Sequence, residues 1–87
     1  MTPPQQMKVT VHFYSYFKEL TGCPKAGFEL SPGATLGDAL QQICTRFPKL
    51  AEMRRSMLMA VGVDYQDGSY KLKAGDEVSL FPPVQGG

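Results

Sequence analysis

The sequence has no tryptophan, a single histidine and only two cysteines in 87 residues. Cys23 and Cys44 are far apart and form no C-x-x-C pair, so with one histidine they supply too few ligands for a structural zinc site. We expect both to be free thiols that serve as small apolar residues in or near the core, and we expect no metal site.

The sequence also lacks an excess of charge of one sign and a long apolar run. Lys and Arg total 9 against 8 Asp and Glu, a formal net charge of +1, so no broad field favours nucleic acid or an anionic membrane. The opening MTPPQQ does not resemble a signal peptide, and no apolar stretch approaches the roughly 18 residues that span a bilayer. We therefore expect a cytoplasmic protein with no nucleic-acid or membrane partner.

The composition that remains, 43% hydrophobic and 20% charged residues, predicts one small folded domain. Residues 7–13, MKVTVHF, alternate apolar and polar side chains as a strand with one buried face does. This pattern places His12 on the polar face, where we assign it no catalytic role. Residues 26–30 are expected to form a second strand, followed by a turn at Pro32-Gly33.

Two segments have helical signals. SYFKELTG predicts one or two helical turns, capped by Ser15 and stopped by Gly22. The main helix is expected to start at Thr35, with Asp38 in the capping-box position, and to end at Pro48. Its wide apolar stripe indicates a helix that lies across a sheet.

The second half of the chain predicts three more strands. MLMAVGV, residues 57–63, is a nearly continuous apolar run and so a candidate central strand. A short segment around Tyr70 and Leu72 and a last strand over residues 77–81 are expected after it. Turns are expected at the DG pair before this short segment and at AGD after it.

This order of elements predicts an α+β fold, a mixed sheet of about five strands with one main helix across it. The helix is a crossover, which makes the strands that it joins parallel, and the last strand is expected beside the first in the sheet interior. We expect residues 1–6 to be a flexible extension, residues 7–81 the domain, and residues 82–87 an extended, mobile tail.

The order of elements and the string DGSYKLKAGDEVSLFPPVQGG together resemble the ubiquitin-like β-grasp sulfur carriers, and most closely the small subunits of molybdopterin synthase. FKELTG also fits the family's pattern, with Lys18 where a basic residue is common. The most specific part is the end of the string, which carries Phe81, Pro82, Pro83, Val84, Gly86 and Gly87.

The resemblance implies that Gly87 is the reacting residue and Gly86 its necessary neighbour. A ubiquitin-activating-like adenylyltransferase would use ATP to convert Gly87 into an acyl-adenylate, and a sulfur donor protein would then leave a C-terminal thiocarboxylate. Inside the large subunit of molybdopterin synthase, this sulfur would pass to a pyranopterin precursor and build the molybdopterin dithiolene. The chain would bind no cofactor and act as a sulfurtransferase only within that enzyme, which the resemblance implies is a heterotetramer.

The residues themselves permit this role. A C-terminal glycine carboxylate is ionised at neutral pH, and residues 82–87 span at most roughly 20 Å when extended. The resemblance and the position of Lys18, Pro82, Pro83 and Val84 suggest partner contacts. Phe81 either anchors the partner or packs in the core, and the sequence leaves both interpretations open.

Other functions with a Gly-Gly end also remain open. The chain could be a ubiquitin-like protein modifier, joined through Gly87 to lysines, or a sulfur carrier for thiazole or cysteine synthesis. It could also be a plain binding module with a frayed terminus. The Phe-Pro-Pro-Val approach to the glycines favours the molybdopterin synthase type.

Overall fold

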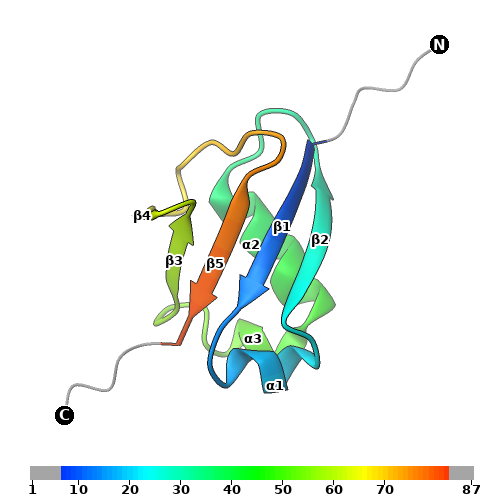
Figure 1. Ribbon diagram of the computed structural model, residues 1–87, viewed down its shortest axis with the longest axis vertical. Coiled ribbons are helices and arrows are strands. Elements are labelled where there is room, and N and C mark those ends of the chain that lie inside the picture. Colours follow the sequence, from blue (N-terminus) through cyan, green and yellow to red (C-terminus); the bar gives the residue numbers. More distant parts are fainter. Residues whose placement is uncertain (1–6, 83–87) are drawn as a thin grey trace.

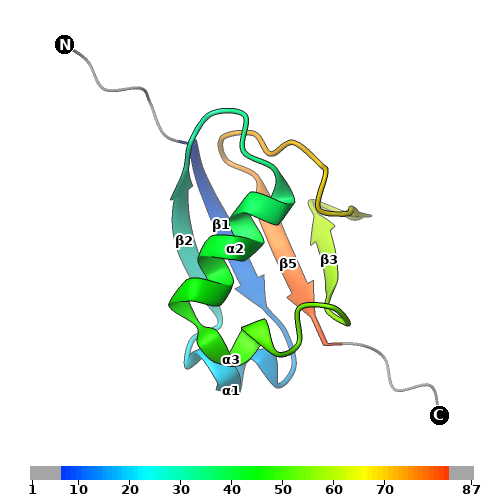
Figure 2. The same cartoon turned by 180° about the vertical axis from the view of Figure 1, so that it is seen from behind.

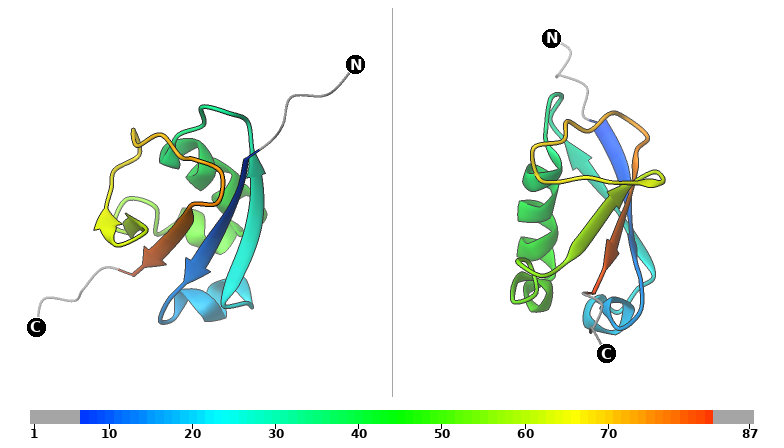
Figure 3. Two further views of the ribbon diagram at one scale, coloured as in Figure 1. Left: turned by 45° about the horizontal axis from the view of Figure 1, so that its top comes forward. Right: turned by 90° about the vertical axis from the view of Figure 1, so that its left-hand side faces the viewer.

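The computed structural model describes residues 7–82. In it, five strands form one sheet with the order β2-β1-β5-β3-β4. The strands are β1 (Met7–Phe13), β2 (Lys25–Leu30), β3 (Leu58–Val61), β4 (Asp64–Tyr65) and β5 (Glu77–Phe81), and the helices are α1 (Phe17–Thr21), α2 (Leu36–Arg46) and α3 (Pro48–Ala51). Within the described part, α2 crosses one face of the sheet and no helix covers the other face (Figures 1, 2 and 3). The predicted α+β layout of two layers is confirmed.

The first strand and the last strand form the interior of the sheet. β1 alternates as its sequence predicts, with Val9, Val11 and Phe13 almost completely buried against α2. β5 lies parallel to β1 and also pairs with β3, so it is the middle strand. Because β1 and β5 run parallel, their carboxyl ends lie at the same end of the sheet (Figure 1).

The capping box of α2 is present as predicted. The Thr35 hydroxyl accepts a hydrogen bond from the backbone N–H of Asp38 (3.2 Å), and the Asp38 carboxylate accepts one from the backbone N–H of Thr35 (2.9 Å). These bonds satisfy donors that no helical carbonyl can reach. The helix ends before Pro48, and its buried face consists of Leu36, Ala39, Leu40, Ile43 and Cys44.

The crossover prediction is also confirmed. β2 runs antiparallel to β1, and β3 runs antiparallel to β5. Since β1 and β5 are parallel, the two strands that α2 joins point the same way. This connection turns the apolar stripe of α2 onto the sheet.

The prediction that Ser15 caps α1 is wrong. Tyr16 is the N-cap residue and makes no side-chain capping bond. Ser15 itself has a φ of 57°, a left-handed conformation that turns the chain out of β1 and is unlike the extended backbone of a capping serine. The first helical N–H groups, of Phe17 and Lys18, donate instead to backbone carbonyls of the preceding turn. Gly22 ends the helix in the left-handed conformation, as predicted.

Two strand predictions in the second half are corrected. The apolar run at residues 57–63 forms only the four-residue β3, which is an interior strand because it lies between β5 and the short edge strand β4. The apolarity of this run does not reflect uniform burial, because Ala60 and Val61 are buried whereas Val63, beyond the bend at Gly62 where φ is 63°, is 96% exposed. The segment around Tyr70 and Leu72 makes only an isolated bridge, through Lys71, because its backbone groups bond to the residues that begin α2.

Candidate functional site at the carboxyl end of β5

Phe81 is the last residue of β5 and lies on the face of the sheet that no described helix covers. Val78 and Leu80 point into the core and are fully buried, and the alternation of a strand therefore directs Phe81 to the opposite face. It is half-buried and is not part of the core cluster. Of the two interpretations that the sequence left open, core packing is thus excluded.

Large apolar side chains from three other segments gather around Phe81. The Tyr14 ring stacks on the Phe81 ring, with centroids 4.8 Å apart and an interplanar angle of 12°. The Tyr65 ring meets it edge-on at 6.4 Å, and Leu58 is its pairing partner on β3. We call Tyr14, Leu58, Tyr65 and Phe81 the aromatic patch.

The aromatic patch is open to solvent. Tyr14 is 42% exposed, Leu58 37% and Tyr65 71%. Single exposed apolar residues are common on proteins, but a contiguous group of large ones usually marks an interaction surface. Because Phe81 is the last residue of β5, the patch lies at the carboxyl end of this strand, directly before Pro82.

The fold keeps the patch rigid. Tyr14 follows β1 directly, and its backbone N–H donates to the Leu80 carbonyl (3.2 Å), which continues the pairing of β1 with β5. β4 brings Tyr65 opposite Ala60, whose neighbour on β5 is Ser79. Aromatic rings held by paired strands lose little conformational entropy on binding, which suits them to anchor a partner.

One hydrogen-bonded pair borders the patch. The Nε2 atom of His12 lies 2.8 Å from the Oε1 atom of Glu77, which is diagonally across from it on β5, and the His12 ring stacks loosely on Tyr14 at 6.4 Å. Both side chains are on the polar face, as the alternation of β1 predicts for His12. The pair links β1 to β5 diagonally across the sheet, and within the described residues no hydrogen bond joins His12 to the hydroxyl of Ser79, its pairing partner on β5.

The other predicted site residues are less fully described. Pro82 is half-buried beside the patch, and Lys18 is exposed on α1, at the same end of the sheet as the carboxyl end of β5 (Figure 1). The Lys18 ammonium forms no hydrogen bond or ion pair with another residue in the range 7–82. The remaining predicted residues, with the expected tail and the expected extension at residues 1–6, lie outside the described residues: Pro83, Val84, Gly86 and Gly87.

The two cysteines are free thiols, as predicted. Cys44 is buried, and the loss of hydration raises the pKa of its thiol, against a smaller opposing effect of the Arg54 charge. Burial thus makes Cys44 a weak nucleophile. Within the described range, no three His, Cys, Asp or Glu side chains gather closely enough to hold a metal ion.

The sequence analysis overlooked three members of the aromatic patch. A signal for Tyr14 was present, since Phe13 and Tyr14 are adjacent aromatic residues at a strand end and must point to opposite faces. Leu58 belongs to a continuous apolar run, a pattern that favours burial. Tyr65 had no detectable signal, because the two-residue strand that positions it is stabilised only by its pairing with β3.

Comparison with known families gives a match over most of the chain, residues 11–87, to the model of the ThiS family. This chain belongs to the ThiS family. The predicted ubiquitin-like β-grasp fold is confirmed, since even a solved archaeal ubiquitin of 16% identity superposes with a TM-score of 0.65. Among the described residues, no helix has both the length and the apolar character needed to cross a membrane.

A curated relative and a solved structure both match nearly the whole chain. The molybdopterin synthase sulfur carrier subunit of Chlamydomonas reinhardtii is 34% identical over 93% of this chain and 100% of that protein. A solved structure from Pyrococcus furiosus, a putative molybdopterin converting factor subunit 1, is 31% identical with a TM-score of 0.82, over 90% of this chain and 99% of that one.

A third relative was solved together with its partner. The structure is a complex of subunits 1 and 2 of the molybdopterin-converting factor from Helicobacter pylori, in which the matched chain is 30% identical with a TM-score of 0.64. The match covers 93% of this chain and 100% of that one. This relative is thus bound to a second subunit in its solved structure.

Proposed function

We propose that this chain is the sulfur carrier subunit of molybdopterin synthase and that Gly87 carries the sulfur. The observation that carries the proposal is the family match, which extends through Gly87, together with relatives of that name that align over nearly their whole length. The aromatic patch supports it, because an exposed apolar surface lies where the chain departs toward the glycines.

The chemistry required of Gly87 is simple. Its carboxylate oxygen attacks the α-phosphorus of ATP within an adenylyltransferase, which releases pyrophosphate and leaves an acyl-adenylate. Sulfur at the oxidation level of sulfide, supplied by a donor protein, then forms a bond to the acyl carbon, and AMP departs. Glycine suits both steps, because it has no side chain to obstruct approach to its carboxyl carbon.

The sulfur is then delivered inside a partner protein. We infer that residues 82–87 enter the large subunit of molybdopterin synthase, where the thiocarboxylate sulfur bonds to a carbon of the pyranopterin precursor as a carbon–oxygen bond at that carbon breaks. Water then cleaves the remaining acyl–sulfur bond and returns Gly87 to a carboxylate. Pro82 and Pro83 restrict the unbound conformations of this segment, and Gly86 keeps it thin near its end. Catalysis belongs to the assembled enzyme, which we propose is a cytoplasmic heterotetramer.

The aromatic patch is the surface best suited to dock the large subunit. Interface anchors are enriched in aromatic side chains, and Phe81 is held on both sides by tyrosine rings directly before the segment that must enter the partner. Docking through the patch fixes the start of that segment against the partner. Val84 would add an apolar contact within the segment, and Lys18 a charged contact at the rim.

The test is the intact mass of the protein purified from its own cells. We expect a fraction in which one oxygen is replaced by sulfur, with fragmentation placing the change at Gly87. A variant without Gly86-Gly87 should be unchanged in fold and should fail to form molybdopterin with a large subunit and precursor. Branched peptides that join Gly87 to lysines, with no thiocarboxylate, would reject the proposal in favour of a protein modifier.

A further inference from the structure

β2 is an edge strand with an unpaired side. It has β1 as its neighbour and pairs with it continuously, from Lys25 opposite His12 to Leu30 opposite Met7. Six residues without proline or a bulge make a regular edge. Edges of this kind pair readily with another strand unless something blocks them.

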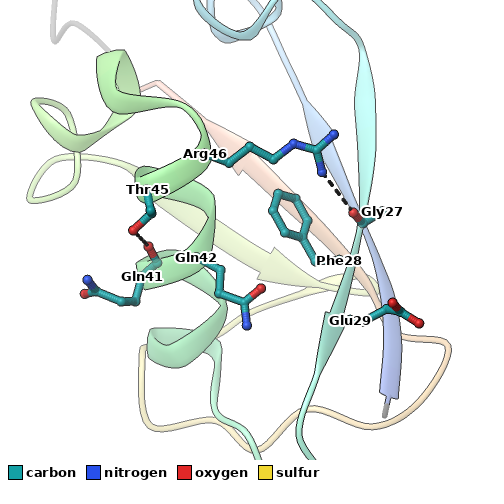
Figure 4. A pocket seen from close by; sticks show the side chains of 7 residues that line it. All are labelled: Gly27, Phe28, Glu29, Gln41, Gln42, Thr45 and Arg46. Carbon is teal, nitrogen blue, oxygen red and sulfur yellow. Dashed lines mark hydrogen bonds between the residues drawn. The ribbon is translucent and has the colours of Figure 1, made fainter.

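The hydrogen-bonding groups that face outward can be assigned from the pairing. The Phe13 N–H donates to the Pro24 carbonyl (2.8 Å), so the backbone groups of Pro24 point toward β1. Backbone direction alternates along a strand, and the N–H and C=O groups that point away from β1 are therefore those of Lys25, Gly27 and Glu29. Arg46 confirms this direction, because its guanidinium reaches the Gly27 carbonyl from outside the sheet at 3.4 Å (Figure 4). A carbonyl has two lone pairs, so this long bond leaves Gly27 able to accept another.

The side chains on this edge are arranged symmetrically about Gly27. Lys25 and Glu29 are both exposed, both lie on the open face of the sheet, and each is two residues from Gly27. Neither forms an ion pair with another residue in the described range. Nothing lies within 4 Å of the position that a Gly27 side chain would occupy.

We propose that β2 pairs antiparallel with β2 of a second copy of this chain, with Gly27 opposite Gly27. In this register, Lys25 of each copy faces Glu29 of the other, and the three outward residues of each strand all find backbone partners. A shift of the register by two residues places Lys25 of each copy opposite Gly27 of the other and loses both charge pairs. The sequence of the edge is therefore complementary to itself in one register.

The side chains of β2 that point toward the helix layer are compatible with the same register. Ala26 and Phe28 point to that side, and the proposed register sets the small Ala26 of one copy opposite the large Phe28 of the other. A groove of about 580 Å³ separates Phe28 from α2 and is lined by polar side chains of Gln41, Gln42 and Thr45 (Figure 4). The groove gives the second strand room beside α2, except at Arg46, whose guanidinium must move off the Gly27 carbonyl as that strand approaches.

The pairing leaves the aromatic patch free. The patch lies over β3, β4 and β5, whereas β2 is at the opposite edge of the sheet (Figure 1). Two copies joined through β2 would form one continuous ten-stranded sheet, from two five-stranded halves, and expose two patches. An interface this short belongs to the weak, transient class, so we expect association only at high protein concentration.

The test is sedimentation equilibrium of the full chain at low salt and concentrations up to about 1 mM. We expect the wild type to form dimers. Lys25→Glu alone and Glu29→Lys alone should each weaken self-association at least about tenfold, because both charge pairs become like-charged. An equimolar mixture of the two variants should associate again, since each strand then faces the opposite charge.

Two further variants check the register and the surface. The double variant Lys25→Glu/Glu29→Lys restores opposite charges within the same register and should dimerise like the wild type. Tyr65→Ser, on the aromatic patch, should leave dimerisation unchanged. Circular dichroism should show the same fold for all variants, because the altered side chains are exposed. A wild type that stays monomeric to about 1 mM, or a dimer indifferent to the charge changes, would overturn the proposal.

Discussion

Replacing Phe81 by alanine should weaken docking to the large subunit more than it weakens the fold. The Phe81 ring makes two aromatic contacts, at 4.8 Å with Tyr14 and at 6.4 Å with Tyr65, and each such pair contributes about 0.5–1.5 kcal/mol. Because the ring is only half-buried, we expect Phe81→Ala to lower the free energy of unfolding by about 1–2 kcal/mol. The folded domain should persist.

The effect on binding should be larger. A central aromatic anchor typically contributes at least about 2 kcal/mol, so the Kd for the large subunit should rise about 30-fold. Isothermal titration calorimetry measures this Kd directly, and thermal unfolding by circular dichroism measures stability. At about 4–8 °C per kcal/mol, the loss of stability appears as a lower Tm.

A matched control separates binding from stability. Phe28 is 5% exposed, lies under the Arg46 guanidinium on the opposite face of the sheet, and is remote from the aromatic patch. Phe28→Leu should cost a similar 1 kcal/mol or so in unfolding free energy and leave the Kd unchanged. If Phe81→Ala bound the large subunit as the wild type does, the assignment of the patch as the docking surface would be refuted.

Three further predictions concern single residues. Thr35→Ala removes a capping-box hydroxyl and should lower the free energy of unfolding in urea by about 1 kcal/mol. The Ser69 hydroxyl and, to a lesser extent, the Ser69 N–H donate hydrogen bonds that lower the pKa of Asp67 in the folded protein. The ionised Asp67 carboxylate therefore stabilises the fold at pH values above its ordinary pKa of 3.8. This contribution is lost as the pH falls through the lower pKa of the folded state. Asp67→Asn should therefore flatten the acid side of the stability profile. Iodoacetamide should alkylate the half-exposed Cys23 before the buried Cys44, whose pKa is raised by burial.

Each of these predictions has its own control. Thr45→Ala removes a hydroxyl that donates only to the carbonyl of Gln41 within α2, so it should cost less than Thr35→Ala, and equal losses would contradict the capping argument. Asp64→Asn alters an exposed carboxylate on β4 and should leave the acid profile of the wild type intact. Faster alkylation of Cys44 than of Cys23 in the native protein would contradict the burial of Cys44 on the sheet-facing side of α2.

Local signals in the sequence predicted much of the fold. The alternation of MKVTVHF gave the limits and the buried face of β1, and Thr35 with Asp38 gave the start of α2, because strand period and capping chemistry depend on nearby residues. The errors arose where distant contacts decide. The residues around Tyr70 have the pattern of a strand, but their backbone groups bond to the start of α2, and no local rule reveals that competition.

The sequence by itself determined the family, the β-grasp order of elements, and Gly87 as the proposed reacting residue, because these depend on a continuous string and on periodicity. Only the tertiary structure decided that Phe81 faces outward with Tyr14 and Tyr65 beside it, since these rings come from β5, the end of β1 and β4. It also decided that Lys25, Gly27 and Glu29 form a free edge. Surfaces are made of residues distant in sequence, and only the pairing of strands brings them together.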